Sequence, residues 1–164
     1  MGFELPDDLH PNCGPVAWLL GTWRGNGHGD YSTIEKFQFG QELIFTHDGR
    51  PFFHYMSRSW IVDEAGEKVR NASIETGFLR CPEPGKVELL LAHASGFVEV
   101  WYGEAEGGKL DLATDAVVRT GSAKEVAAGK RLYGNVEGDL LYAYDMAAVG
   151  EALQPHLWAR LQRV

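Results

Sequence analysis

The side chains of this sequence most able to bind a metal are its six histidines, His10, His28, His47, His54, His93 and His156. None of them pair at the spacing of a multi-histidine zinc or non-haem iron site. Cys13 and Cys81 are the only cysteines, and they do not form a CxxC pair. The sequence therefore argues against a zinc site and against a disulfide framework.

His156 differs from the other histidines in its surroundings. Pro155 fixes the chain on one side, and Leu157 and Trp158 on the other side would make an apolar wall. One imidazole beside an apolar cavity is what a five-coordinate haem needs, because the porphyrin supplies the other four nitrogens. The spacing of the residues around His156 alone still favours an ordinary surface or core histidine. Haem binding by His156 is therefore a hypothesis at this point.

The sequence lacks the usual enzyme signatures. It has no GxxxxGK[ST] phosphate loop, no HExxH and no GxSxG. The stretch G-N-G-H-G at residues 25–29 resembles a nucleotide-binding loop, but no helix follows it. We interpret these glycines as positions where a strand bends sharply within a small barrel.

The elements that would position these side chains are mostly short strands. A short helix is predicted over residues 15–20, with Asn12 as a candidate cap and Gly21 ending it. Strands are predicted over residues 22–28, 37–47, 52–62, 73–80, 86–92, 97–102, 109–120, 125–136 and 139–146. Glycine-containing turns separate these strands at the spacing of an up-and-down meander. Such a meander closes into a barrel or stacks as a β-sandwich, and the pattern alone does not separate the two.

The last segment, residues 154–164, fits a strand or a short helix. In a helix Leu157 and Leu161 would share a face, whereas in a strand His156, Trp158 and Arg160 would. As a tenth strand the segment would pair with the first strand and close the barrel, with His156 at one rim of the cavity.

Length and composition predict one domain over residues 1–164, because 164 residues with 45% hydrophobic and 12% aromatic content can bury a sizeable core. The net charge of -8 disfavours nucleic acid and anionic membrane surfaces as partners. The first ten residues lack the pattern of a signal peptide, and no apolar run is long enough to span a membrane. With two unpaired cysteines, these features predict a cytoplasmic protein.

Several ordered motifs resemble those of the nitrobindins, a family of haem-binding β-barrels that includes the C-terminal domain of a human THAP-type protein. The opening L-L-G-T-W-R-G-N-G at residues 19–27 contains Trp23, a residue suited to plug the end of a barrel. It is followed by Y-S-T-I at 31–34, E-T-G-F-L-R at 75–80, V-E-L-L-L-A-H-A-S-G at 87–96 and A-L-Q-P-H-L-W-A-R-L at 152–161. The resemblance covers the chain from about Pro15 to its end.

This resemblance implies a ten-stranded antiparallel up-and-down β-barrel that binds one haem b per subunit near one opening. His156 matches the axial ligand of the iron and the catalytic position of the family, and Thr33 matches a haem-contacting threonine. Met146, Ser73 and His93 match positions that border the haem. Some relatives carry histidine where this chain has Ser73, which implies a weaker polar contact there.

The family's activity implies that the protein isomerises peroxynitrite to nitrate on ferric haem and binds nitric oxide, with the sixth iron position open. An exposed edge near the haem would allow a homodimer. Two alternatives remain from the sequence: a haem-free, lipocalin-like carrier of a small apolar ligand, and a haem or nitric oxide sensor.

Overall fold

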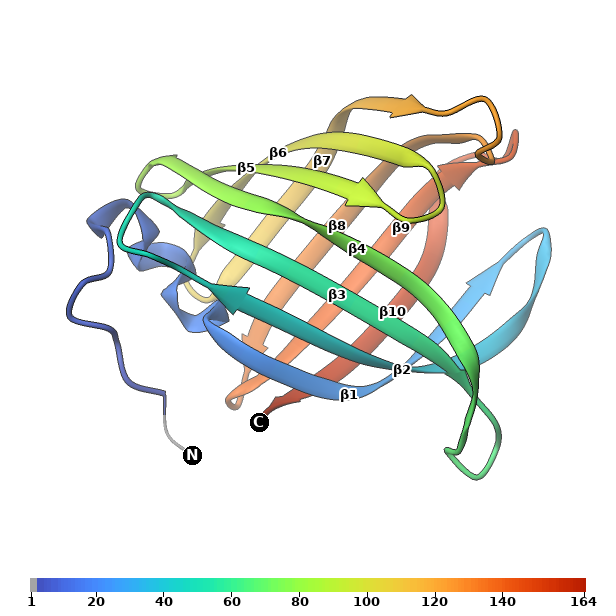
Figure 1. Ribbon diagram of the computed structural model, residues 1–164, viewed down its shortest axis with the longest axis horizontal. Helices are drawn as coiled ribbons and strands as arrows, with labels where there is room; N and C mark the ends of the chain where they lie inside the picture. Colours follow the sequence, from blue (N-terminus) through green and yellow to red (C-terminus); the bar gives the residue numbers. More distant parts are fainter. Residues whose placement is uncertain (1–2) are drawn as a thin grey trace.

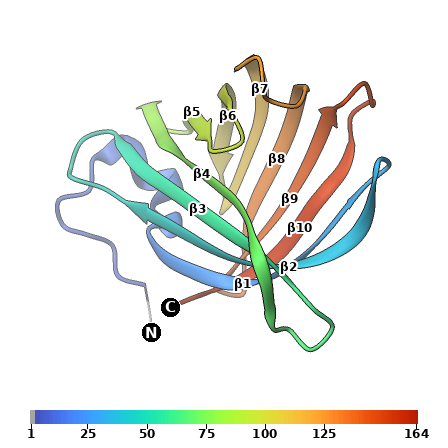
Figure 2. The same ribbon diagram turned by 45° about the vertical axis from the view of Figure 1, so that its right-hand side comes forward.

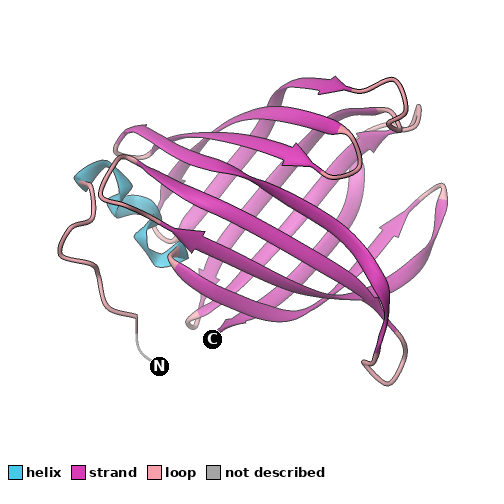
Figure 3. Cartoon of the chain, viewed as in Figure 1, coloured by secondary structure: helices cyan, strands magenta, loops and turns pink. Residues whose placement is uncertain are grey.

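The computed structural model describes residues 3–164, and strands make up most of it (Figures 1 and 3). Met1 and Gly2 lie outside the described residues. They begin the ten-residue segment in which the sequence shows no signal-peptide pattern. A 3₁₀ helix, η1, spans Pro11–Leu19. The strands are β1 (Gly21–Tyr31), β2 (Ile34–Thr46), β3 (Phe52–Val62), β4 (Lys68–Glu83), β5 (Lys86–His93), β6 (Phe97–Glu106), β7 (Lys109–Arg119), β8 (Val126–Val136), β9 (Asp139–Ala148) and β10 (Gln154–Arg163).

The strands form one closed antiparallel barrel in which each strand pairs with its neighbours in sequence and β1 pairs with β10. The predicted ten-stranded barrel is thus confirmed, and the β-sandwich is excluded. The ambiguous last segment is a strand, since Trp23 to Gly29 of β1 pair with β10 residue by residue from Arg163 to Leu157. Without β10, one edge of β1 would expose unpaired backbone groups.

The short helix predicted over residues 15–20 is present, but it begins earlier and ends one residue sooner. Residues Pro11–Leu19 form the 3₁₀ helix, and His10 caps it by accepting a hydrogen bond on Nδ1 from the Asn12 backbone at 3.1 Å. Pro15 lies inside this helix and has no N–H to donate, which disfavours a regular α-helix there. Asn12, the predicted cap, instead donates its side-chain amide to the Cys81 carbonyl at the end of β4.

Helix η1 covers one end of the barrel, and the β1–β2 and β3–β4 hairpins project at the other (Figure 2). Trp23 fills the covered end: it is fully buried, and its indole Nε1 donates to the Leu19 carbonyl at 2.8 Å. The Arg163 guanidinium lies over the Trp23 ring at 4.1 Å and donates to the Trp18 carbonyl at 2.7 Å. These contacts tie the last strand to the helix and fill this end of the barrel with side chains.

The glycines of β1 give its neighbours room for aromatic rings. A Cβ atom at Gly29 would lie 2.0 Å from Cζ of Phe37, and one at Gly27 would lie 2.5 Å from Cζ of Phe39. The G-N-G-H-G stretch is therefore part of a strand, as interpreted, and only glycine lets the two phenylalanine rings cover it. Within residues 3–164 we find no helix long and apolar enough to cross a membrane.

Candidate functional site

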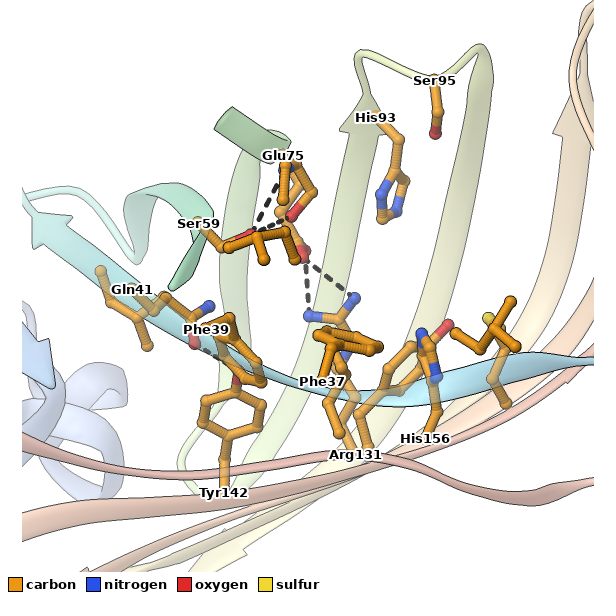
Figure 4. A pocket seen from close by; sticks show the side chains of 18 of the residues that line it. Phe37, Phe39, Gln41, Ser59, Glu75, His93, Ser95, Arg131, Tyr142 and His156 are labelled. Atoms are coloured by element: carbon orange, nitrogen blue, oxygen red, sulfur yellow. Dashed lines mark hydrogen bonds and ion pairs between the residues drawn. The ribbon is translucent and has the colours of Figure 1, made fainter. Parts of the chain in front are cut away.

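A cavity of about 770 Å³ occupies the barrel at the end away from η1. This volume falls within the ~300–1,000 Å³ typical of small-molecule and cofactor sites. Aromatic and aliphatic side chains share its wall with an extensive polar set (Figure 4). That polar set comprises Gln41, Tyr55, Ser59, Ser73, Glu75, His93, Ser95, Arg131, Tyr133, Tyr142, Tyr144 and His156, with Glu35, Lys36 and Arg70 completing it.

His156 reaches this cavity because β10 carries a β-bulge. Pro155 pairs with Asp145 and Leu157 with Tyr144, so His156 is the extra residue between them. Both His156 and Leu157 line the cavity, whereas Trp158 is 44% exposed. The expectation that His156, Trp158 and Arg160 share one face is therefore wrong: a bulge interrupts the alternation of a strand and re-aims one side chain.

The orientation of the His156 ring leaves one nitrogen free. Nδ1 lies 3.0 Å from the backbone carbonyl of Asp30, and because a carbonyl can only accept, Nδ1 carries the proton. Burial lowers the pKa of His156, although the Asp30 carbonyl and carboxylate partly oppose this effect. The imidazole is therefore neutral at pH 7 and has a lone pair on Nε2, which is the state that binds a metal.

Three aromatic rings hold the His156 imidazole in place. Tyr31, Phe37 and Tyr144 contact it edge-on, with ring centroids 5.4, 6.4 and 5.8 Å from that of His156. The Tyr31 hydroxyl accepts from the Ala148 backbone at 2.8 Å and donates to the Met146 carbonyl at 3.1 Å. Tyr31 thereby joins the end of β1 to the end of β9 across the bulged start of β10, which fixes the bulge itself.

A buried ion pair spans the middle of the cavity. Arg131 on β8 donates from Nη1 to Glu75 on β4 at 2.9 Å, and to the Tyr133 hydroxyl at 3.2 Å. Its guanidinium also lies 4.9 Å from the Trp101 ring and 4.7 Å from the Tyr144 ring. Burial alone would lower the pKa of Arg131, but Glu75 and the surrounding tyrosines raise it well above its ordinary value, so the cation is kept.

Hydroxyl and amide groups satisfy one another deeper in the barrel. Tyr142 donates its hydroxyl to the Gln41 side chain, which in turn donates to the Ser57 hydroxyl at 2.8 Å. Burial raises the pKa of the Tyr142 phenol far above its usual range, so it remains a neutral donor. The cavity thus has a polar floor, a charged middle and a mouth beside His156.

The structure brings together four of the five residues singled out in the sequence. His156, Met146, Ser73 and His93 all line the cavity. Thr33 lies in the exposed turn between β1 and β2, next to the cavity-lining Ile34 and not in the wall itself. The roles of these residues toward haem stay predictions.

Sequence reasoning did not single out Tyr31, Arg131, Glu75 or Glu99. Arg131 and Glu75 are 56 residues apart and Tyr31 lies 117 residues from Ala148, so no local pattern connects them. An available signal was the rarity of charged residues at inward positions of strands: Arg131 and Glu99 alternate with exposed neighbours just as the buried apolar residues do.

The donor set of the cavity fits a haem. Among residues 3–164, no three His, Cys, Asp or Glu side chains come together as ligands for a bare metal ion. His156 instead offers one neutral imidazole nitrogen, beside aromatic walls suited to a flat apolar ring. The fold and site therefore define a closed ten-stranded barrel with a cofactor-sized cavity and a neutral imidazole, His156, able to bind a metal at its mouth.

The chain belongs to the THAP4-like, heme-binding beta-barrel domain family, whose model matches residues 12–163. The resemblance to the nitrobindins is thereby confirmed. The chain is 77% identical to a peroxynitrite isomerase of Nocardioides sp., over 99% of each protein. It is 44% identical to a ferric nitrobindin-like protein of Streptomyces griseus subsp. griseus, over 98% of this chain and 86% of that protein. The crystal structure of Rv2717c from M. tuberculosis superimposes with a TM-score of 0.86 at 37% identity, covering 95% of this chain and 99% of that one.

Proposed function

We propose that this protein binds one haem b in the cavity and isomerises peroxynitrite to nitrate. The observation that carries the proposal is the His156 ring, which donates from Nδ1 to the Asp30 carbonyl and keeps a free lone pair on Nε2. His156 would be the axial ligand, and Met146, Ser73, His93 and Thr33 would border the group. The names of the relatives, peroxynitrite isomerase and ferric nitrobindin-like protein, support this assignment.

The chain's own contribution to the chemistry is to hold and orient. A bound ferric haem would supply a Lewis-acidic iron able to take a small anion or nitric oxide at a coordination position that the protein leaves open. Asp30 fixes the tautomer of His156, and the three aromatic rings around the imidazole fix its orientation. A hydrogen bond from the second ring nitrogen of a histidine makes the first nitrogen a better metal ligand.

The charges at the mouth favour entry of an anion in spite of the net charge of -8. Lys36 and Arg70 line the cavity, are exposed, and make no ion pair within residues 3–164, and the exposed Glu35 in the same wall offsets one of these two positive charges. Local positive charge at an entrance concentrates anions over about one Debye length, or roughly 8 Å at physiological salt. We therefore expect peroxynitrite capture to weaken at high salt and in a Lys36→Gln/Arg70→Gln variant.

Hemin titration of the apo-protein tests the proposal. We expect a saturable Soret band for wild type, and loss or a marked shift of that band in His156→Ala. His28→Ala is the matched control, because His28 lies on the neighbouring strand β1, stacked on Trp158 and not in the cavity wall. An unchanged spectrum in His156→Ala would refute the assignment of the axial ligand.

The alternatives predict other results. A haem-free carrier would not bind hemin and would show bound lipid in native mass spectrometry. A sensor would bind haem, but peroxynitrite decay in stopped flow would be unaffected by the holo-protein.

We also propose a cytoplasmic location, supported by the two free buried thiols Cys13 and Cys81. The expectation of a homodimer stays a prediction, which light scattering would test.

A further inference from the structure

Two imidazoles face each other across the cavity. His156 lies on β10 and His93 at the end of β5, and in the closed barrel these strands are five steps apart in either direction. Both residues line the same cavity, and both strands end or begin at the side away from η1. Figure 4 shows the two side chains projecting into this space from opposite walls. A flat group held by His156 would therefore have His93 on its other face.

A buried carboxylate holds His93. Its Nε2 lies 2.5 Å from Oε1 of Glu99 on β6, and the Glu99 side chain is 0% exposed. The other carboxylate oxygen, Oε2, has no hydrogen-bond partner among the described residues. Because burying an unpaired carboxylate is costly, the contact with His93 is the one that makes Glu99 tolerable at this position.

Ring stacking fixes the remaining freedom of His93. Phe97, its cross-strand partner beyond the β5–β6 turn, lies parallel to it, with ring centroids 3.9 Å apart at an angle of 14°. Since Glu99 accepts from Nε2, Nδ1 is left without a partner in the described chain. A carboxylate that orients an imidazole through one nitrogen, so that the other nitrogen can act, is the arrangement of acid–base sites in enzymes.

We propose that His93 and Glu99 form a dyad that contacts ligands bound on the side of the haem opposite His156. His93 is the residue that touches the ligand, through Nδ1, and Glu99 is a positioning residue that fixes the tautomer and the ring orientation. The inference rests on the proposed haem binding and adds to it a hydrogen-bond acceptor, Nδ1 of His93, for ligands that carry a proton.

The positioning role is tested first in the apo-protein. The ¹⁵N shifts of His93 should show a single state with Nε2 protonated in wild type. In Glu99→Gln they should move toward a mixture of tautomers, since the neutral amide binds the Nε2 proton less strongly. A purely structural role for Glu99 would change the stability of the fold and leave the tautomer unchanged.

The ligand contact is tested with imidazole, which binds ferric haem through one nitrogen and donates a hydrogen bond from the other. Removing one partner leaves the other buried, so the main variant is His93→Phe/Glu99→Leu, which removes both together. We expect its imidazole affinity to fall about 10-fold, as for loss of one hydrogen bond, with Glu99→Gln in between. His54→Phe is the control, because His54 is exposed on β3 and bonds Thr76 instead.

The outcomes separate this inference from the proposed function. A normal Soret band with unchanged imidazole affinity in the double variant would overturn the dyad and leave haem binding by His156 intact. A wild-type protein that takes up no hemin would overturn both. A normal Soret band with weakened imidazole binding, and no change in His54→Phe, is the result that we expect.

Discussion

The ion pair between Arg131 and Glu75 allows a quantitative test of how the charged middle of the cavity is held. The side chains are 6% and 13% exposed, so the pair is almost completely removed from water. Glu75→Gln would leave the Arg131 cation buried without a counter-charge, with only the neutral amide oxygen of the new side chain and the Tyr133 hydroxyl as acceptors. Breaking a buried pair from one side costs about 3–5 kcal/mol, because the charge that remains loses its compensation.

The loss translates into a large change in melting temperature. For chains of this size each kcal/mol corresponds to about 2–4 °C, so Glu75→Gln should lower Tm by about 6–20 °C. The double variant Glu75→Leu/Arg131→Met removes both charges and should stay within about 1 kcal/mol of wild type, since apolar replacement of a buried pair is often neutral or better. Urea unfolding monitored by tryptophan fluorescence measures both variants.

The matched control is the exposed pair between Arg80 and Glu88, whose atoms are 2.5 Å apart on the outside of β4 and β5. Glu88→Gln should cost less than about 1 kcal/mol, because surface ion pairs contribute little. The reasoning is refuted if Glu75→Gln costs no more than this control, or if the double variant is as unstable as the single one.

Three further predictions concern the walls of the barrel. Tyr31→Phe leaves the Ala148 backbone N–H without its buried acceptor and should cost about 1–3 kcal/mol in urea unfolding; an unchanged midpoint would contradict the role of Tyr31 in fixing the bulge. Gly29→Ala places a Cβ atom 2.0 Å from the Phe37 ring, so it should cost about 1–3 kcal/mol and weaken hemin binding, whereas wild-type hemin affinity would show that the ring moves freely. Hydrogen bonds and charges from Arg24 and Arg58 lower the pKa of Glu42 below its ordinary value of 4.5. The contribution of ionised Glu42 to the stability of the fold is therefore present above pH 4.5 and is lost as the pH falls through the lowered pKa. Wild type should therefore exceed Glu42→Gln in stability at pH 7, and this difference should shrink as the pH is lowered below 4.5, whereas a difference that stays constant throughout acid titration would refute this.

Local patterns predicted most of the barrel from the sequence. Turns such as residues 94–96 and 137–138 place glycine where φ is positive, with Gly96 at 108° and Gly138 at 84°, and only glycine adopts these angles easily. Between the turns the alternation of buried and exposed residues identified the strands. The long strand β4 was the main exception: it begins at Lys68, whereas the pattern predicted residue 73, because its first residues are exposed on both faces and carry no alternation.

The candidate site was predicted only in part, for a related reason. Motif resemblance identified His156, which the structure places in the cavity, but strand alternation grouped it with Trp158 and Arg160, which lie on the outside of the barrel. A bulge depends on pairing with β9 and on the Tyr31 contact with Ala148, which is distant in sequence. The periodicity of residues within one strand contains no information about its pairing with another strand or about a contact with a distant residue.

The sequence by itself determined the strands, their turns and the family, because each of these depends on neighbours a few residues away. Only the tertiary structure decided that β10 closes the barrel, that His156 turns inward, and that Arg131 meets Glu75 and His93 meets Glu99. Barrel closure sets these contacts by bringing strands that are distant in the chain to opposite walls of one cavity.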